Sequence, residues 1–149
     1  RYGSSAASDV YKRQDLECEG KEVDLETLEY IHLHKTGALL KACVRTGAMI
    51  AGANEELLKA LTTYAEGIGL AFQIIDDILD LTSSSEKLGK TAGKDLLADK
   101  TTYPKLLGME ESKKRAFDLV DKAKKAIEPW GLNAKYLISL ADFITSRDR

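Results

Sequence analysis

Three carboxylates and a glutamine follow one face of an otherwise apolar stretch in the middle of the chain. Gln73, Asp76, Asp77 and Asp80 stand at i, i+3, i+4 and i+7, a spacing that normally makes the apolar face of a buried helix. Carboxylates this close repel one another unless cations neutralise them. Mg²⁺ does so readily, because it takes carboxylate oxygens and completes its coordination with water and substrate phosphates. The pattern predicts a magnesium site in which Asp76, Asp77 and Asp80 converge on one patch.

An acidic face that meets only water is the alternative interpretation of this segment. Against it, the residues that flank the aspartates are strongly apolar, which is typical of a helix that packs in a core. Gln73 extends the polar line inward, and Gly69, one turn earlier, leaves room above it. Soft ligands are absent from the segment, which argues against zinc. We therefore favour the magnesium site.

A lysine-rich connection follows the aspartates. It contains Lys90 and Lys100, with Gly89 and Gly93 nearby. Lysine is a point charge suited to phosphate oxygens, and glycine lets the backbone approach a ligand closely. Taken alone, this pattern is more typical of an ordinary basic surface loop. Beside the aspartates it favours a diphosphate that Mg²⁺ and lysines hold together.

The segment HKTGALLK carries a weaker signal. Lys35 offers a cation and Thr36 a hydroxyl, while Gly37 loosens the helix at that point. His32 and His34 are two residues apart, so on a helix they face different directions and do not form a metal pair. We interpret both histidines as incidental.

Composition is that of an ordinary globular domain. The 149 residues are 44% hydrophobic with a formal net charge of -2, which gives no reason to expect nucleic acid as a partner. Cys18 and Cys43 match no metal-binding spacing and are too few for a disulfide framework, so a reducing compartment is expected. No apolar run approaches the roughly 18 residues that a membrane span requires.

The periodicity predicts an all-α, antiparallel helical bundle, with no alternating strand pattern. Asp24 and Asn54 are expected to cap helices, because their side chains can accept hydrogen bonds from the first-turn amides. Residues 1–14, RYGSSAASDVYKRQ, look like translated adapter sequence, and we expect them to be a non-native leader. The remaining expected elements are a helix that runs through the aspartates and ends in the segment TSSS at 82–85, and a connection over 82–108 with a helical turn near 95–99. They also include a helix over 110–127 and a last helix from Asn133; the inner face of the first is expected to carry Ala116, Val120, Ala123 and Ile127.

Four segments resemble, in order, the C-terminal half of the trans-isoprenyl diphosphate synthases, the family of farnesyl and geranylgeranyl diphosphate synthases. They are HKTGALL, GLAFQIIDDILD, LGKTAGKDLLADKTTYP and LADFITSR. The resemblance runs from about Asp15 to the end of the sequence. It implies that residues 15–149 are the C-terminal half of a single isoprenyl diphosphate synthase domain, an all-α bundle of the isoprenoid synthase type around a central cavity.

The resemblance also implies an activity and its residues. The family condenses isopentenyl diphosphate with an allylic diphosphate, using Mg²⁺, and the product here would be geranylgeranyl or farnesyl diphosphate. Asp76, Asp77 and Asp80 match the second aspartate-rich motif and would be metal ligands, Asp76 the strongest. With Lys35 they would form the catalytic set. The residues implied in substrate binding are Lys35, Thr36, Phe72, Gln73, Lys90 and Lys100.

The departures from the family pattern are equally informative. The first aspartate-rich motif and the isopentenyl diphosphate site of the family are not found in this sequence, so we expect residues 15–149 alone to be inactive. The resemblance implies a homodimer for the full-length protein, without nucleic acid or a membrane span. The expected location is cytoplasmic, or the plastid stroma if the source is an alga or plant.

Two alternatives from other classes stay open. A class I terpene cyclase also uses DDxxD, but it would show a second metal motif of the N-x-x-x-S/T-x-x-x-E kind, which does not follow Asp80. A non-catalytic subunit of a heteromeric prenyl synthase would often have a degraded aspartate motif, whereas Asp76, Asp77 and Asp80 are all present.

Overall fold

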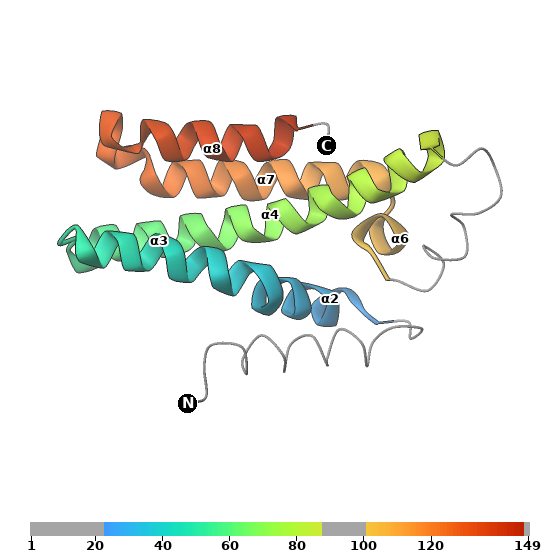
Figure 1. Ribbon diagram of the computed structural model, residues 1–149, viewed down its shortest axis with the longest axis horizontal. Helices are drawn as coiled ribbons and strands as arrows, with labels where there is room; N and C mark the ends of the chain where they lie inside the picture. The colour runs from blue at the N-terminus through green and yellow to red at the C-terminus, as the bar shows by residue number, and fades with distance from the viewer. Residues whose placement is uncertain (1–22, 88–100, 148–149) are drawn as a thin grey trace.

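The computed structural model describes residues 23–87 and 101–147, and within these ranges the chain is helical with no strand (Figure 1). The prediction of an all-α fold is confirmed. The expected leader 1–14, the helical turn near 95–99 and the two lysines Lys90 and Lys100 lie outside the described residues.

Eight helical elements are described. In chain order they are α2 (Leu25–His32), the π-helix η1 (Leu33–Gly37), α3 (Ala38–Ile50), α4 (Glu55–Lys87), α6 (Tyr103–Leu107), α7 (Met109–Ile127), the 3-10 segment η2 (Glu128–Ala134) and α8 (Lys135–Ser146). Both predicted caps are present: Asp24 Oδ1 accepts the Thr27 amide at 2.8 Å, and Asn54 Oδ1 accepts the Leu57 amide at 2.9 Å. These side chains satisfy amides that a helix start leaves without partners.

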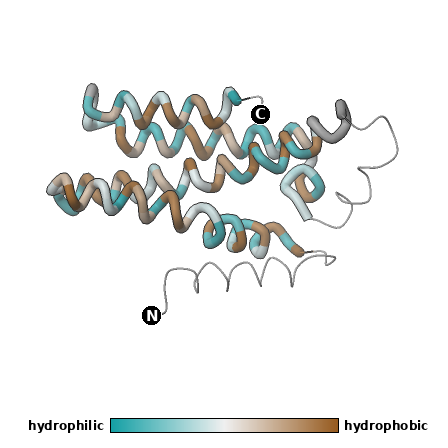
Figure 2. Tube along the Cα trace, in the orientation of Figure 1, coloured by the Kyte–Doolittle hydropathy of each residue, from teal (hydrophilic) through white to brown (hydrophobic). Residues whose placement is uncertain are grey.

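Helix α4 is the central element of the fold. It packs against α7 and α8 on one side and against α2, η1 and α3 on the other, and α6 lies near its C-terminal half (Figure 1). Apolar residues recur along all the long helices (Figure 2). Those of α4 and α7 make most of the core, which includes Tyr64, Ile68, Ile74, Ala116, Val120, Ala123 and Ile127. The predicted inner face of the 110–127 helix is therefore correct.

Three boundaries differ from the sequence prediction. Helix α4 continues through the serine run to Lys87, because serines cost a helix little and an uninterrupted helix keeps its backbone hydrogen bonds. A short helix, α6, lies within the expected connection. The last helix begins at Lys135 rather than Asn133, since Gly131 has a positive φ of 56° and breaks the helical path just before it.

At Gly37 and Gly69 the backbones of η1 and α4 approach closely. A Cβ placed on Gly69 would lie 3.0 Å from Gly37 Cα, which is tighter than nine in ten real Cβ contacts. The prediction that Gly69 leaves room above Gln73 is therefore wrong. The missing side chain is used instead for backbone-to-backbone packing of η1 on α4.

Candidate active site

Asp76 lies on the solvent side of α4 in a cluster of residues from two helices. Gln73, one turn earlier, donates from Nε2 to Asp76 Oδ2 at 3.3 Å. Arg147, directly after α8, donates from Nη2 to Asp76 Oδ1 and also to the Phe72 carbonyl at 3.1 Å. The Arg147 guanidinium carbon is 4.0 Å from the centre of the Phe72 ring, within the range of a cation–π contact. Three residues that the sequence predicted, Phe72, Gln73 and Asp76, are thus brought together.

The charge of Asp76 reflects two opposing influences. Partial burial raises the pKa of its carboxyl above the usual value, since removal from water disfavours the charged form. The Arg147 guanidinium acts against this and lowers the pKa, whereas the negative charges of Asp80 and Asp77 raise it. The side chain of Arg147 is 11% exposed and that of Asp76 38% exposed, so this ion pair is only partly in contact with water.

Asp77, the next residue, has different surroundings. It is 2% exposed, and its Oδ2 atom accepts the backbone N–H of Tyr103 at 3.2 Å and lies 3.3 Å from His32 Nε2. Thr102 and Tyr103, at the start of α6, are buried beside it. The carboxylate thus joins three elements inside the core, α2, α4 and α6.

The predicted single patch of three carboxylates is therefore wrong for Asp77. Asp80 is exposed and Asp76 partly exposed, but a step of one residue turns about 100° around a helix. That rotation takes Asp77 from the solvent side to the core side. The face shared by Gln73, Asp76 and Asp80 is the polar face that remains.

The other predicted residues lie on η1 or outside the described ranges. Lys35 is exposed and Thr36 half-buried, both within the π-helix η1. Insertion of a π turn into an α-helix is uncommon and is often found at functional sites.

Sequence reasoning missed two residues at this site. His32, interpreted as incidental, is 4% exposed and contacts Asp77, so that interpretation is wrong. His34 makes a local contact: its Nδ1 lies 2.7 Å from the Tyr30 carbonyl, one turn earlier. Arg147 had no local signal except its place at the end of the segment LADFITSR, and its partner Asp76 is 71 residues away.

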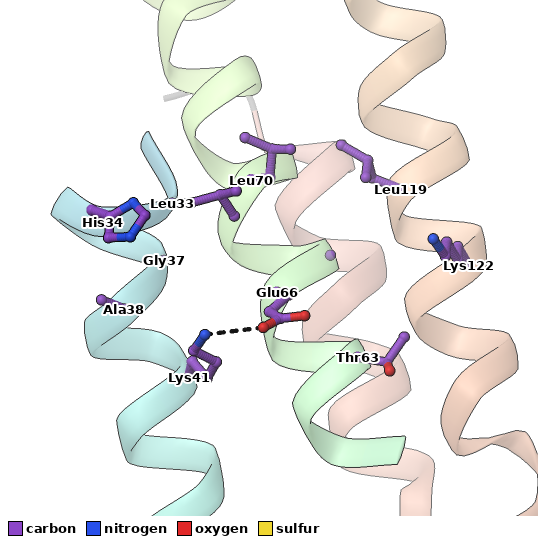
Figure 3. A pocket seen from close by; sticks show the side chains of 11 residues that line it. Leu33, His34, Gly37, Ala38, Lys41, Thr63, Glu66, Leu70, Leu119 and Lys122 are labelled. Atoms are coloured by element: carbon purple, nitrogen blue, oxygen red, sulfur yellow. Dashed lines mark hydrogen bonds and ion pairs between the residues drawn. The ribbon is translucent and has the colours of Figure 1, made fainter. Parts of the chain in front are cut away.

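A separate cavity of about 350 Å³ lies between η1, α4 and α7 (Figure 3). Leu33, Leu70 and Leu119 form its apolar wall, and the ion pair between Lys41 Nζ and Glu66 Oε1, at 3.0 Å, lies at one side. Among the described residues, none of those that the sequence predicted for substrate or metal lines this cavity.

The fit of a metal ion to the acidic face rests on Asp76 and Asp80. Over residues 23–87 and 101–147, no three His, Cys, Asp or Glu side chains form a ready set of ligands. Two carboxylates one turn apart nevertheless suit Mg²⁺, which is typically held by one or two carboxylates together with water and substrate phosphates. The donor set is all oxygen, which matches a hard cation.

Comparison with known proteins identifies the family to which this fold and motif belong. A model of the polyprenyl synthetase family matches residues 5–129. This chain belongs to the polyprenyl synthetase family. The match covers the cap at Asp24, the π-helix and the whole of the acidic segment of α4.

Individual members of the polyprenyl synthetase family agree with that assignment. The chain is 54% identical over 135 residues to the geranylgeranyl diphosphate synthase of Cyanophora paradoxa, covering 90% of this chain and 45% of that protein. It is 53% identical over 136 residues to the chloroplastic geranylgeranyl pyrophosphate synthase of Capsicum annuum, covering 90% and 37%. The crystal structure of an FPP/GFPP synthase from Zymomonas mobilis superposes with a TM-score of 0.75 at 33% identity, covering 93% and 44%. The chain thus spans less than half the length of each of these proteins.

Proposed function

We propose that this chain is part of a Mg²⁺-dependent prenyltransferase that condenses isopentenyl diphosphate with an allylic diphosphate to give a short-chain isoprenyl diphosphate, geranylgeranyl or farnesyl. The observation that carries this proposal is the polar face of α4, where Asp76, hydrogen-bonded by Gln73, stands one turn from Asp80 in a chain of the polyprenyl synthetase family.

The acidic face would supply charge where the reaction needs it. Asp76 and Asp80 would hold Mg²⁺, which when bound neutralises the diphosphate and stabilises it as it leaves. Lys35 would contact the allylic diphosphate, with Thr36, Phe72 and Gln73 lining the site near the reacting carbon. Lys90 and Lys100 complete the proposed diphosphate contacts. Fixed cations aimed at a departing diphosphate are a large catalytic contribution, because they need no reorganisation as the charge develops.

The alternatives have less support. The relatives named above are diphosphate synthases, and none of those three is named as a terpene cyclase. A non-catalytic subunit would not need the Asp76 carboxylate to stay on a solvent face beside Asp80. No helix within the described ranges is long and apolar enough to cross a membrane. We propose a homodimer in the cytoplasm, or in the plastid stroma if the source is photosynthetic.

The direct test uses a complete synthase that carries this chain. It is either the full-length protein or a hybrid in which residues 15–149 replace the matched segment of the Cyanophora paradoxa relative. Incubation with labelled isopentenyl diphosphate, geranyl diphosphate and Mg²⁺ should give a labelled prenyl product. Asp76→Asn should abolish nearly all of it, and Asp118→Asn, an exposed aspartate on α7, serves as the matched control. A complete synthase that makes no product, or an Asp76→Asn variant as active as the control, would overturn the proposal.

The same assay tests the isolated segment. Residues 15–149 expressed alone should give no prenyl product, because the family's first aspartate-rich motif and isopentenyl diphosphate site are not in the sequence. Product from the isolated segment would mean that the active site lies elsewhere in the chain.

A further inference from the structure

Two contacts fix the π-helix η1 against α4, one at each end. At its start, His32 Nε2 lies 3.3 Å from Asp77 Oδ2. At its end, Gly37 packs against Gly69, where a Cβ added to Gly69 would lie only 3.0 Å from Gly37 Cα. The chain directions are opposite, because His32, just before η1, meets the later residue of α4, and Gly37, at the end of η1, meets the earlier one. Lys35 and Thr36 lie between these two contacts.

The contact at His32 is built from fully buried polar groups. Asp77 Oδ2 already accepts the Tyr103 backbone N–H at 3.2 Å, and a carboxylate oxygen only accepts, so His32 Nε2 is the donor of the second bond. The His32 ring stacks on Tyr103, with ring centres 5.7 Å apart and planes 14° from parallel. His32 Nδ1 has no hydrogen-bond partner among the described residues. The Nε2 atom is therefore the polar contact of this side chain.

An apolar residue could fill the position of His32 without the cost of burying polar groups. Burial of an imidazole and a carboxylate together removes both from water, and a matched apolar pair is often as stable. What the polar pair adds is direction, because a hydrogen bond forms only when the two atoms meet at one distance and angle. The pair thus favours one register of η1 on α4.

We propose that His32 is a positioning residue for the prenyl transfer reaction: through its bond to Asp77 it fixes Lys35 and Thr36 on η1 relative to Asp76 on α4. This inference rests on the proposed function. Lys35 follows His32 by three residues, and Asp76 precedes Asp77 by one, so the bond joins the two turns that carry the proposed diphosphate contact and metal ligand. A displacement of about 1 Å between such groups can cost roughly 100-fold in rate.

Two substitutions of His32 test the roles of its two ring nitrogens separately. His32→Gln places an amide nitrogen near the position of Nε2 and can still donate to Asp77. His32→Asn places its amide near the position of Nδ1 and is too short to reach Asp77. Both variants keep a polar side chain in the same buried site, so they share the general cost of losing the imidazole. His34→Gln is the control, because it makes the same change two residues away, at a histidine whose Nδ1 lies 2.7 Å from the Tyr30 carbonyl of the neighbouring turn.

The measurements are kcat and KM for geranyl diphosphate in the complete synthase, each corrected for the folded fraction from its thermal transition. We expect His32→Asn to lower kcat by about 10- to 100-fold, with a smaller change in KM. His32→Gln should recover most of kcat, and His34→Gln should match the wild type.

Each outcome bears on a different proposal. Equal kcat in His32→Gln and His32→Asn, or a wild-type kcat in His32→Asn, would overturn the positioning role and leave prenyl transfer intact. A wild-type complete synthase without prenyl transfer would instead overturn the proposed function. If His32→Asn does not fold while His32→Gln does, Asp77→Asn takes its place. It keeps an oxygen for both donors, so the inference requires a kcat near that of His32→Gln, and a loss comparable with that of Asp76→Asn would contradict it.

Discussion

The solvent side and the core side of α4 give neighbouring aspartates opposite surroundings. Asp76 faces Arg147 and Gln73 at the edge of solvent, whereas Asp77 is enclosed with His32 and the Tyr103 amide. Both are carboxylates in the same turn of one helix. The side of the helix, rather than the residue type, therefore decides whether a carboxylate can bind a ligand or holds the fold together.

The difference also explains how the motif is used. Carboxylates at 76 and 80 share one face, because four residues make slightly more than one helical turn. The residue between them in sequence, Asp77, turns inward and is retained there by two hydrogen-bond donors from α2 and α6. The DDxxD segment of α4 thus places two carboxylates, Asp76 and Asp80, on the outside of the helix and one, Asp77, on the inside.

The largest expected effects come from replacing these two aspartates by alanine. In the complete synthase, Asp76→Ala should lower kcat by about 100- to 1,000-fold, as loss of a charge-stabilising group in an active site commonly does, with little change in unfolding free energy. Asp77→Ala should destabilise the fold by about 3–5 kcal/mol, because it leaves buried donors without an acceptor. Steady-state kinetics and urea unfolding measure the two effects. An Asp77→Ala protein as stable as the wild type would contradict the structural role of Asp77.

The close approach of η1 to α4 gives the next largest effect. Gly69→Ala should destabilise the fold by about 1–3 kcal/mol, because the new Cβ meets the Gly37 backbone at 3.0 Å and the backbone of η1 must shift to make room for it. Gly47→Ala is the matched control: Gly47 lies within α3 with nothing within 4 Å of a new Cβ, so alanine there should stabilise by roughly 0.5–1 kcal/mol. Chemical denaturation of both variants distinguishes the effect of the new close contact from the effect of helix propensity. The change in unfolding free energy must have opposite signs in the two variants.

Local features of this fold could be predicted from the sequence. Asp24 and Asn54 were identifiable as caps because each bonds an amide three residues away. The buried face of α7 followed from apolar residues at helical spacing, and the polar face of α4 from Gln73, Asp76 and Asp80. In each case the partner lies within one or two turns, so the local pattern contains the information.

Long-range contacts could not be predicted in the same way. His32 meets Asp77 across 45 residues, and Arg147 meets Asp76 across 71. Nothing in the spacing of His32 and His34 indicates that one is buried and the other is not. The helical pattern also placed Asp77 with the other aspartates, because three carboxylates within five residues span more than one face and the sequence does not show which face is covered by α6.

The two carboxylates on the solvent side of α4 also lead to a prediction about Mg²⁺ affinity. Asp76 and Asp80 offer few oxygens for one Mg²⁺, so the affinity of the complete synthase for Mg²⁺ should be low alone and at least about tenfold higher with pyrophosphate, which adds ligand oxygens. Titration calorimetry with and without pyrophosphate measures this coupling. The coupling should disappear in Asp76→Ala and persist in Asp118→Asn. Equal Mg²⁺ affinity with and without pyrophosphate would show that the metal is not shared with the diphosphate.

The smallest expected effect lies on the core side of α4, at Tyr64. Its side chain is fully buried and its hydroxyl donates to the Leu137 carbonyl of α8 at 2.7 Å. Burial raises the pKa of Tyr64 to about 12, above the value of about 10 for tyrosine in an unfolded chain. The protonated hydroxyl therefore contributes stability in full below about pH 10, and that contribution is lost as the pH rises through about 12.

Tyr64→Phe should accordingly lower the unfolding free energy by about 0.5–1.5 kcal/mol near neutral pH, the usual net value of one hydrogen bond. The gap between wild type and Tyr64→Phe should narrow as the pH rises above about 10, because only the wild type then loses stability through ionisation of this hydroxyl. Urea unfolding of both proteins across this range gives the gap directly, with Tyr136→Phe at an exposed tyrosine as the control. A gap that stays constant with pH would mean that Tyr64 ionises as readily in the fold as in the unfolded chain, and that the core side of α4 is more open to water than its burial indicates.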